Sequence, residues 1–120
     1  MLWSKQVVID VLSSKKYTIA IGEYPGGDYD LLPLYVHHPD KLGEDEDFIT
    51  ITPFIDPQSK GVVDPNLDQD IVAVEVRCQA SDSRGGCESD DEIIVHMYAD
   101  VKLVLKKMGH NVIRHYDEIF

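Results

Sequence analysis

Positive charge, cysteine and long apolar runs are scarce in this chain of 120 residues. It has 11 Lys and Arg against 22 Asp and Glu, which gives a formal net charge of −11. A protein of that charge repels phosphate, so we expect no direct binding to nucleic acid. No apolar run approaches the ~20 residues that a membrane helix needs, so we expect no membrane partner.

The N-terminal residues show no charged leader followed by an apolar core, so we expect no signal peptide and a reducing compartment. The two cysteines, Cys78 and Cys87, bracket a polar loop. In a reducing compartment a disulfide between them is less expected than two thiols. The sequence contains no Cys-x-x-Cys or His-x-x-x-His motif, and we expect no metal or other cofactor.

Apolar residues make up 43% of the chain, too many for a disordered protein. The length fits one domain over residues 1–120. A chain of this size buries roughly two-thirds of its unfolded surface, so it needs no disulfide or metal to fold.

The clearest predicted element lies near the C-terminus. Ser89 and Glu92 match the capping box Ser-x-x-Glu, which begins a helix. Apolar residues then follow the 3.6-residue period, lysines gather towards the end, and Gly109 is suited to the position after the helix. The pattern predicts an amphipathic helix over about 90–108 whose apolar face packs on a sheet.

Four segments predict strands. Residues 70–79 alternate between a valine face, which Cys78 continues, and a polar face exposed to solvent. Further strands are predicted at 17–21, 48–55 and 111–116. Pro53 lacks a backbone donor, so the strand at 48–55 should end there or lie at an edge.

A short helix is predicted near the N-terminus, with Ser4 as its N-cap and Val7 and Val8 on its apolar face. The β-branched residues leave a strand at 6–12 as an alternative. Long loops are predicted at 22–47 and 56–69. The fold expected is α+β, an antiparallel sheet of about four strands with the long C-terminal helix on one face and the short N-terminal helix nearby. The core should include Val72, Val74, Val76, Ile94, Met97, Val101, Val104 and Leu105.

His37, His38 and Asp40 could serve a small enzyme, and this is the weakest of the functional hypotheses. Adjacent histidines on an extended segment point to opposite sides, so they rarely bind one ion together. No Gly-x-Ser-x-Gly motif marks a nucleophile. We therefore expect a protein that is not an enzyme.

Tyrosines and acidic residues mark a candidate interface. Tyrosines are enriched at protein interfaces, and three of them lie in the predicted loop at 22–47. A run of acids follows, which is either a solvated surface or a surface for a basic partner. Near 82–92 one arginine stands among several acids. The candidate interface residues are Tyr24, Tyr29, Tyr35, Glu44, Asp45, Glu46, Asp47 and Arg84.

The C-terminal part resembles a known family. A strand over 71–78, a polar loop, a helix over 91–108 that ends at Gly109, and a closing segment over 116–120 are similar to the tail terminator and head–tail joining proteins of long-tailed bacteriophages. The resemblance covers about residues 48–120. Residues 1–47 match loosely, and the Gly-, Asp- and Pro-rich segment before residue 48 departs from the pattern.

The resemblance implies a structural protein of the virion that is often hexameric. Such proteins form a ring that caps the tail tube and connects it to the neck. The implied partners are copies of the chain itself and the tail tube and neck proteins. The implied location is the virion, and the host cytoplasm during assembly. The family offers no catalytic residues to carry over.

The alternative hypothesis is a small acidic inhibitor that imitates DNA and binds a host nucleic-acid-binding enzyme. Carboxylates in a continuous stripe, spaced like phosphates, would favour the inhibitor. Acids on several faces and on loop tips would favour the ring subunit.

Overall fold

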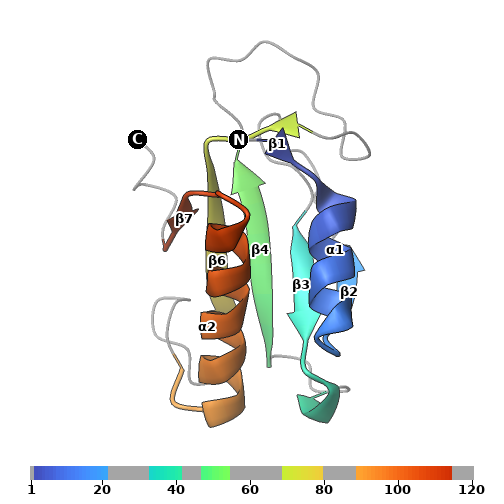
Figure 1. Cartoon of the computed structure of the whole chain (residues 1–120). Helices are drawn as coiled ribbons and strands as arrows, with labels where there is room; N and C mark the ends of the chain where they lie inside the picture. The colour runs from blue at the N-terminus through green and yellow to red at the C-terminus, as the bar shows by residue number, and fades with distance from the viewer. Residues whose placement is uncertain (1, 22–32, 42–46, 55–68, 80–88, 115–120) are drawn as a thin grey trace.

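The computed structural model describes residues 2–21, 33–41, 47–54, 69–79 and 89–114 (Figure 1). These residues form an α+β fold. Its elements are β1 (Leu2–Trp3), α1 (Lys5–Ser14), β2 (Thr18–Ile21), β3 (Leu34–His37), the 3₁₀-helix η1 (Pro39–Lys41), β4 (Phe48–Phe54), β5 (Gln69–Asp70), β6 (Ala73–Gln79), α2 (Glu92–Lys107) and β7 (Val112–Ile113).

The main sheet has five strands in the order β2-β3-β4-β6-β7, and β1 and β5 form a separate antiparallel pair. Neighbours from β2 to β6 are antiparallel, whereas β7 pairs parallel to β6. The prediction of an antiparallel sheet of about four strands is therefore correct in outline, but it misses one strand and the parallel pairing of β7 with β6. The reason is that α2 connects β6 to β7 and carries the chain back across the sheet, as a parallel pair requires.

The additional strand, β3, lies inside the predicted loop at 22–47, so that loop prediction is wrong here. Leu34 and Val36 are fully buried, and they alternate with Tyr35 and His37. β3 pairs with β2 on one side and β4 on the other, and this central place outweighs its short length. Of the predicted loop at 56–69, only Gln69 lies within the described residues, in β5.

Both helices lie on the same face of the sheet, with α1 over the β2–β3 side and α2 over β4 and β6 (Figure 1). In α1 the side chains of Val8 and Leu12 are fully buried, whereas Val7 is 47% exposed, so only part of the predicted apolar face is correct. Ser4 occupies the N-cap position, but its side chain makes no capping hydrogen bond. Residues 6–12 are helical, and the alternative of a strand is not adopted.

Helix α2 confirms the prediction over 90–108 and ends one residue before the predicted limit. All the predicted core residues of this helix are buried. The predicted cap is wrong. The carboxylate of Asp91, not the hydroxyl of Ser89, accepts from the N–H of Ile93 at 2.9 Å, while the Ser89 Oγ accepts from the N–H of Asp91 at 3.1 Å. Aspartate is among the preferred N-cap residues, and its charge suits the helix N-terminus.

The sheet buries parts of both of its faces. Val74 and Val76 of β6 pack under the helices, as predicted, but Val72 is 41% exposed because it precedes the strand, so its assignment to the core is wrong. On the opposite face Thr50 and Glu75 are only 8% and 7% exposed, which contradicts the expected polar face open to solvent.

Pro53 lies inside β4, which continues to Phe54 and occupies the centre of the sheet. The predicted end or edge at this proline is therefore wrong. The pairing of β4 with β3 stops at Ile51, so among the described residues Pro53 has a partner strand only on the β6 side. A proline without a backbone donor is tolerated where one side of the ladder has ended.

Both helices end in the same backbone motif. After α2, Gly109 has φ of 93°, and the N–H of His110 donates to the carbonyl of Leu105. After α1, Lys16 has φ of 73°, and the N–H of Tyr17 donates to the carbonyl of Leu12. This is the Schellman arrangement, in which a left-handed residue closes the helix. Gly109 fulfils its predicted role.

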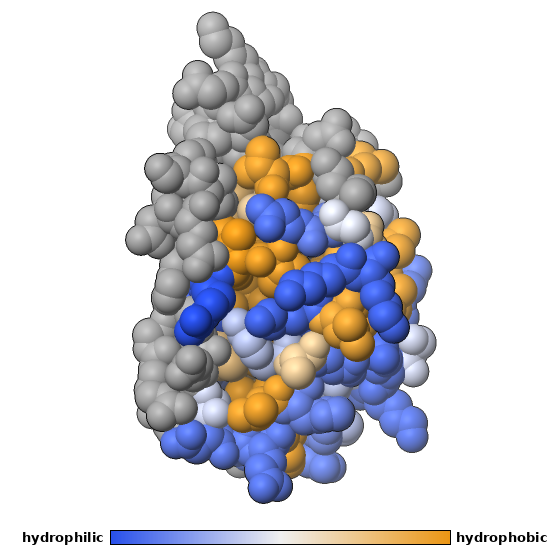
Figure 2. Space-filling model, turned by 60° about the vertical axis from the view of Figure 1, so that its left-hand side comes forward, coloured by the Kyte–Doolittle hydropathy of each residue, from blue (hydrophilic) through white to orange (hydrophobic). Residues whose placement is uncertain are grey.

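The surface carries isolated large apolar side chains among polar ones. Figure 2 shows one face, on which apolar patches alternate with hydrophilic residues. Single exposed apolar residues are normal on soluble domains, so their positions on particular elements decide whether they matter. In the part of the chain that the structure describes, the exposed large apolar residues are Leu2, Val7, Ile21, Val72, Val95 and Leu103.

Candidate functional site

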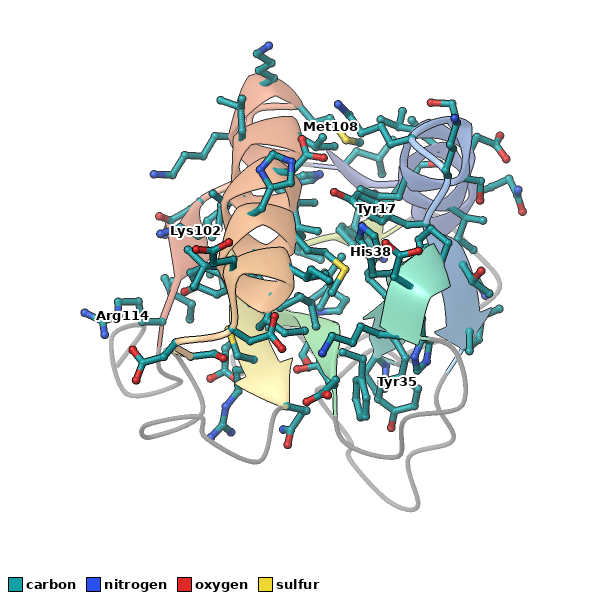
Figure 3. All side chains as sticks on the ribbon, turned by 90° about the horizontal axis from the view of Figure 1, so that it is seen from below. Tyr17, Tyr35, His38, Lys102, Met108 and Arg114 are labelled. Atoms are coloured by element: carbon teal, nitrogen blue, oxygen red, sulfur yellow. The ribbon has the colours of Figure 1, made fainter. Side chains whose placement is uncertain are left out.

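Tyr35 is the only predicted interface tyrosine among the described residues. It lies on β3 and is half-buried, on the sheet face that points away from the helices (Figure 3). Its ring contacts Phe48 edge-on, with centroids 5.4 Å apart. The contact leaves Tyr35 part of a small aromatic group on that face. Tyr24, Tyr29, Glu44, Asp45, Glu46 and Arg84 lie outside the described residues.

Asp47, the last predicted interface acid, is held within the fold. The Nζ of Lys41 lies 3.5 Å from the Asp47 carboxylate and 2.7 Å from that of Asp91. The hydrogen bond from Lys41 lowers the pKa of Asp91, and its bond to Asp91 raises the pKa of Lys41. The lysine therefore ties the start of β4 to the start of α2. Because Asp47 is paired with Lys41, it does not supply an unpaired carboxylate of the kind that imitation of DNA phosphates would require.

The histidines of the weak enzyme hypothesis lie on opposite sides of the sheet. The ring of His37 is 5.1 Å from Phe48, whereas that of His38 is 6.1 Å from Tyr17 on the helix side (Figure 3). The backbone N–H of Asp40 donates to His38 Nδ1 at 3.0 Å, a local turn contact. Across the described ranges no three His, Cys, Asp or Glu side chains gather as a metal site would require.

Tyr17, Asp100 and Lys15 form a polar contact that the sequence does not indicate. The hydroxyl of Tyr17 donates to Asp100 Oδ2 at 2.8 Å, and Lys15 Nζ lies 3.3 Å from Asp100 Oδ1. Burial raises the pKa of Tyr17, and the hydrogen bond to Asp100 adds to the effect. Because residues 17 and 100 are far apart in sequence, no local pattern marks the pair. The contact joins α1 and β2 to the middle of α2.

His110 is a second feature that sequence reasoning missed. It is 5% exposed, and in the described structure neither ring nitrogen has a hydrogen-bond partner. Its ring lies 5.4 Å from that of Trp3, and burial lowers its pKa. The signal available in the sequence is its place directly after Gly109, where the Schellman motif favours an apolar contact.

Cys78 is 1% exposed, which confirms its predicted place in the core. Cys87 lies outside the described residues, so the predicted absence of a disulfide between the two stays a prediction.

Strand β2 presents an open edge. It is the terminal strand of the main sheet, and no strand within the described ranges pairs with its outer side. Thr18 and Ala20 are exposed, and Ile21 is 48% exposed. Natural edge strands are usually guarded by lysine, proline or a bulge. Thr18–Ile21 contains no charged residue or proline, and its register with β3 is unbroken.

None of the helices in the described residues is long and apolar enough to cross a membrane. Comparison with known proteins gives no likeness: no family model, no curated protein and no solved structure matches the chain.

Proposed function

We propose that the protein is a non-enzymatic structural subunit of a bacteriophage virion, similar to tail terminator or head–tail joining proteins. In this role it forms a ring of identical copies that caps the tail tube and connects it to the neck. It acts in the virion and is assembled in the host cytoplasm. The proposal takes its biological setting from the resemblance over residues 48–120 and its assembly surface from the open edge of β2.

The unguarded β2 edge is the observation that supports the proposal of self-assembly. An exposed edge offers a row of backbone donors and acceptors that a strand from another chain can pair with. The opposite end of the sheet is a different strand, β7. A contact between two different surfaces of identical subunits repeats head to tail and gives a ring when the rotation closes. Pairing of β2 with the β7 side of the next subunit is such a contact.

The test is the mass of the protein in solution, measured by light scattering over a concentration series. We expect the average mass to rise with protein concentration until it reaches the mass of a ring. Ile21→Lys places a charge on the β2 edge and should weaken assembly at least tenfold, about 1.4 kcal/mol per subunit contact.

Val95→Lys is the matched control, because Val95 on α2 is 49% exposed, close to the 48% of Ile21, and the substitution adds the same charge. The control should assemble like the wild-type protein. Equal weakening by both variants would show that charge alone acts, and a wild-type protein that stays monomeric at every concentration would contradict assembly through β2.

A further inference from the structure

A groove runs between α1 and α2 on the helical side of the molecule. Its volume is about 250 Å³, and its walls include Val11, Val104 and Met108. Figure 3 shows Met108 and Tyr17 in the space between the two helices. Leu103 stands at the rim and is 52% exposed. A large apolar side chain beside an apolar groove extends the surface that an incoming apolar group would cover.

The groove lies in the cationic part of an acidic protein. The segments 11–22 and 101–116 contain no Asp or Glu, although the chain has a net charge of −11. Five of the 11 Lys and Arg residues in the chain are lysines of these two segments. Two of those five lysines line the groove. The lysines of the two segments are Lys15, Lys16, Lys102, Lys106 and Lys107.

The acid in the groove is already engaged. Asp100 is the single acid among the described residues that line the groove, and it accepts from the Tyr17 hydroxyl and pairs with Lys15. Lys107, on the other side of the groove, has no acidic partner in the described part of the chain. The groove therefore offers positive charge to a ligand, which gives it a charge opposite to most of the molecule.

The size of the groove limits what can enter. Drug-sized ligands occupy roughly 300–1,000 Å³, and an apolar cavity of roughly 150 Å³ holds a benzene ring. At about 250 Å³ the groove accommodates one large apolar side chain. Lys15 follows the end of α1 and Lys107 is the last residue of α2, so carboxylates on both sides of such a side chain can each meet a lysine.

We propose that this groove binds an acidic peptide segment of a partner protein, with one large apolar side chain inserted between α1 and α2. The inference stands apart from ring formation, since it uses neither the β2 edge nor a second copy of the chain.

The test is a titration of ¹⁵N-labelled protein with the blocked pentapeptide Glu-Asp-Phe-Asp-Glu, followed by amide chemical shifts. We expect saturable shifts concentrated at Val11, Leu103, Val104 and Met108. Glu-Asp-Ala-Asp-Glu lacks the anchor and Gln-Asn-Phe-Asn-Gln lacks the charge, so each should bind at least tenfold more weakly. Equal binding of all three peptides would overturn the proposal.

Two variants on α2 separate the groove from the general charge of the helix. Lys107 lines the groove, whereas Lys102 stacks over the Tyr98 ring at 5.0 Å and does not line it. Lys107→Glu should weaken the pentapeptide at least tenfold, and Lys102→Glu should leave it within about twofold. Equal loss in both variants, or binding of anionic lipid vesicles with no response to the pentapeptide, would refute the groove as a peptide site.

Discussion

His110 shows how one side chain can be fixed by the backbone around it. Its N–H completes the closing motif of α2, and this places the imidazole in the core beside Trp3. Buried nitrogens without partners favour the neutral ring, because a charged imidazolium would lose its hydration there. The residue is thus a polar group held in an apolar setting by its position in the chain.

The sign of the pH effect follows from the lowered pKa. In the unfolded chain His110 takes up a proton near its ordinary pKa of 6.5, whereas the folded protein takes it up only at lower pH. Stability is therefore full above about pH 6.5 and decreases as the pH falls below that value. We expect urea unfolding at pH 7.5 and 5.5 to show this loss, and His110→Leu to reduce it.

His96→Leu provides the control, since His96 is an exposed histidine on α2, the helix that precedes His110. It should keep the pH dependence of the wild-type protein. If His110→Leu retained that dependence too, another group would be responsible.

For single residues, the sequence predicts burial or a structural role where this depends on neighbours within the same element. The buried positions of α2 repeat with the helical period and were all identified, as was Gly109. Pairings between distant residues, such as Tyr17 with Asp100 or Lys41 with Asp47 and Asp91, were not, because side-chain contacts across the fold leave no periodic trace in the sequence.

The two helix ends differ in one respect at the scale of elements. Both need a residue in the left-handed region, which glycine adopts readily and an L-residue with a Cβ does not. α2 supplies Gly109 there, whereas α1 supplies Lys16. The end of α1 is thus a place where the chain departs from its most stable local sequence.

Lys16→Gly should therefore stabilise the protein. Removing the Cβ relieves roughly 1–2 kcal/mol of left-handed strain, and the greater freedom of glycine in the unfolded chain offsets roughly 0.4–1 kcal/mol of that. We expect a gain of about 0.5–1 kcal/mol in the free energy of unfolding, measured by chemical denaturation. Lys15→Gly, one residue earlier with φ of −90°, should bring no gain. A destabilised Lys16→Gly protein would show that the lysine side chain contributes more than the strain removes.

Among the elements, length and position decided what could be predicted. The 16 residues of α2 carry several turns of apolar repeat, so the helix was predicted nearly in full. The four residues of β3 are too few for alternation to stand out beside Pro33, so the segment read as a loop. The parallel join of β7 depends on topology and not on local sequence.

At the scale of the molecule, charge is unevenly distributed and poorly compensated. With a net charge of −11, the acidic side chains of one molecule repel each other, and each molecule repels other copies of the chain. Ion pairs that are open to solvent contribute little to stability, and the pairs of Lys41 and Lys15 are all partly open. Long-range repulsion should therefore outweigh these pairs in the overall electrostatic contribution to stability.

Added salt should then stabilise the protein. At 0.1 M the Debye length is about 10 Å, so salt screens distant repulsion more than close ion pairs. We expect the melting temperature, followed by circular dichroism, to rise between 10 and 300 mM NaCl. The same salt should favour the self-assembly that we propose. A melting temperature that fell with salt would place the electrostatic stability in the specific pairs instead.

The sheet order has a consequence for the way the chain folds. From β2 to β4 each strand lies beside the next one in sequence, and β6 follows next to β4. Contacts between neighbouring segments close short loops and form quickly, whereas distant contacts are slow. During synthesis the sheet can therefore grow one strand at a time as the chain emerges from the ribosome. The last elements to be synthesised, α2 and β7, then cover the apolar surface of the sheet that is exposed until they emerge. We therefore expect ribosome-bound chains lacking α2 to need protection from aggregation.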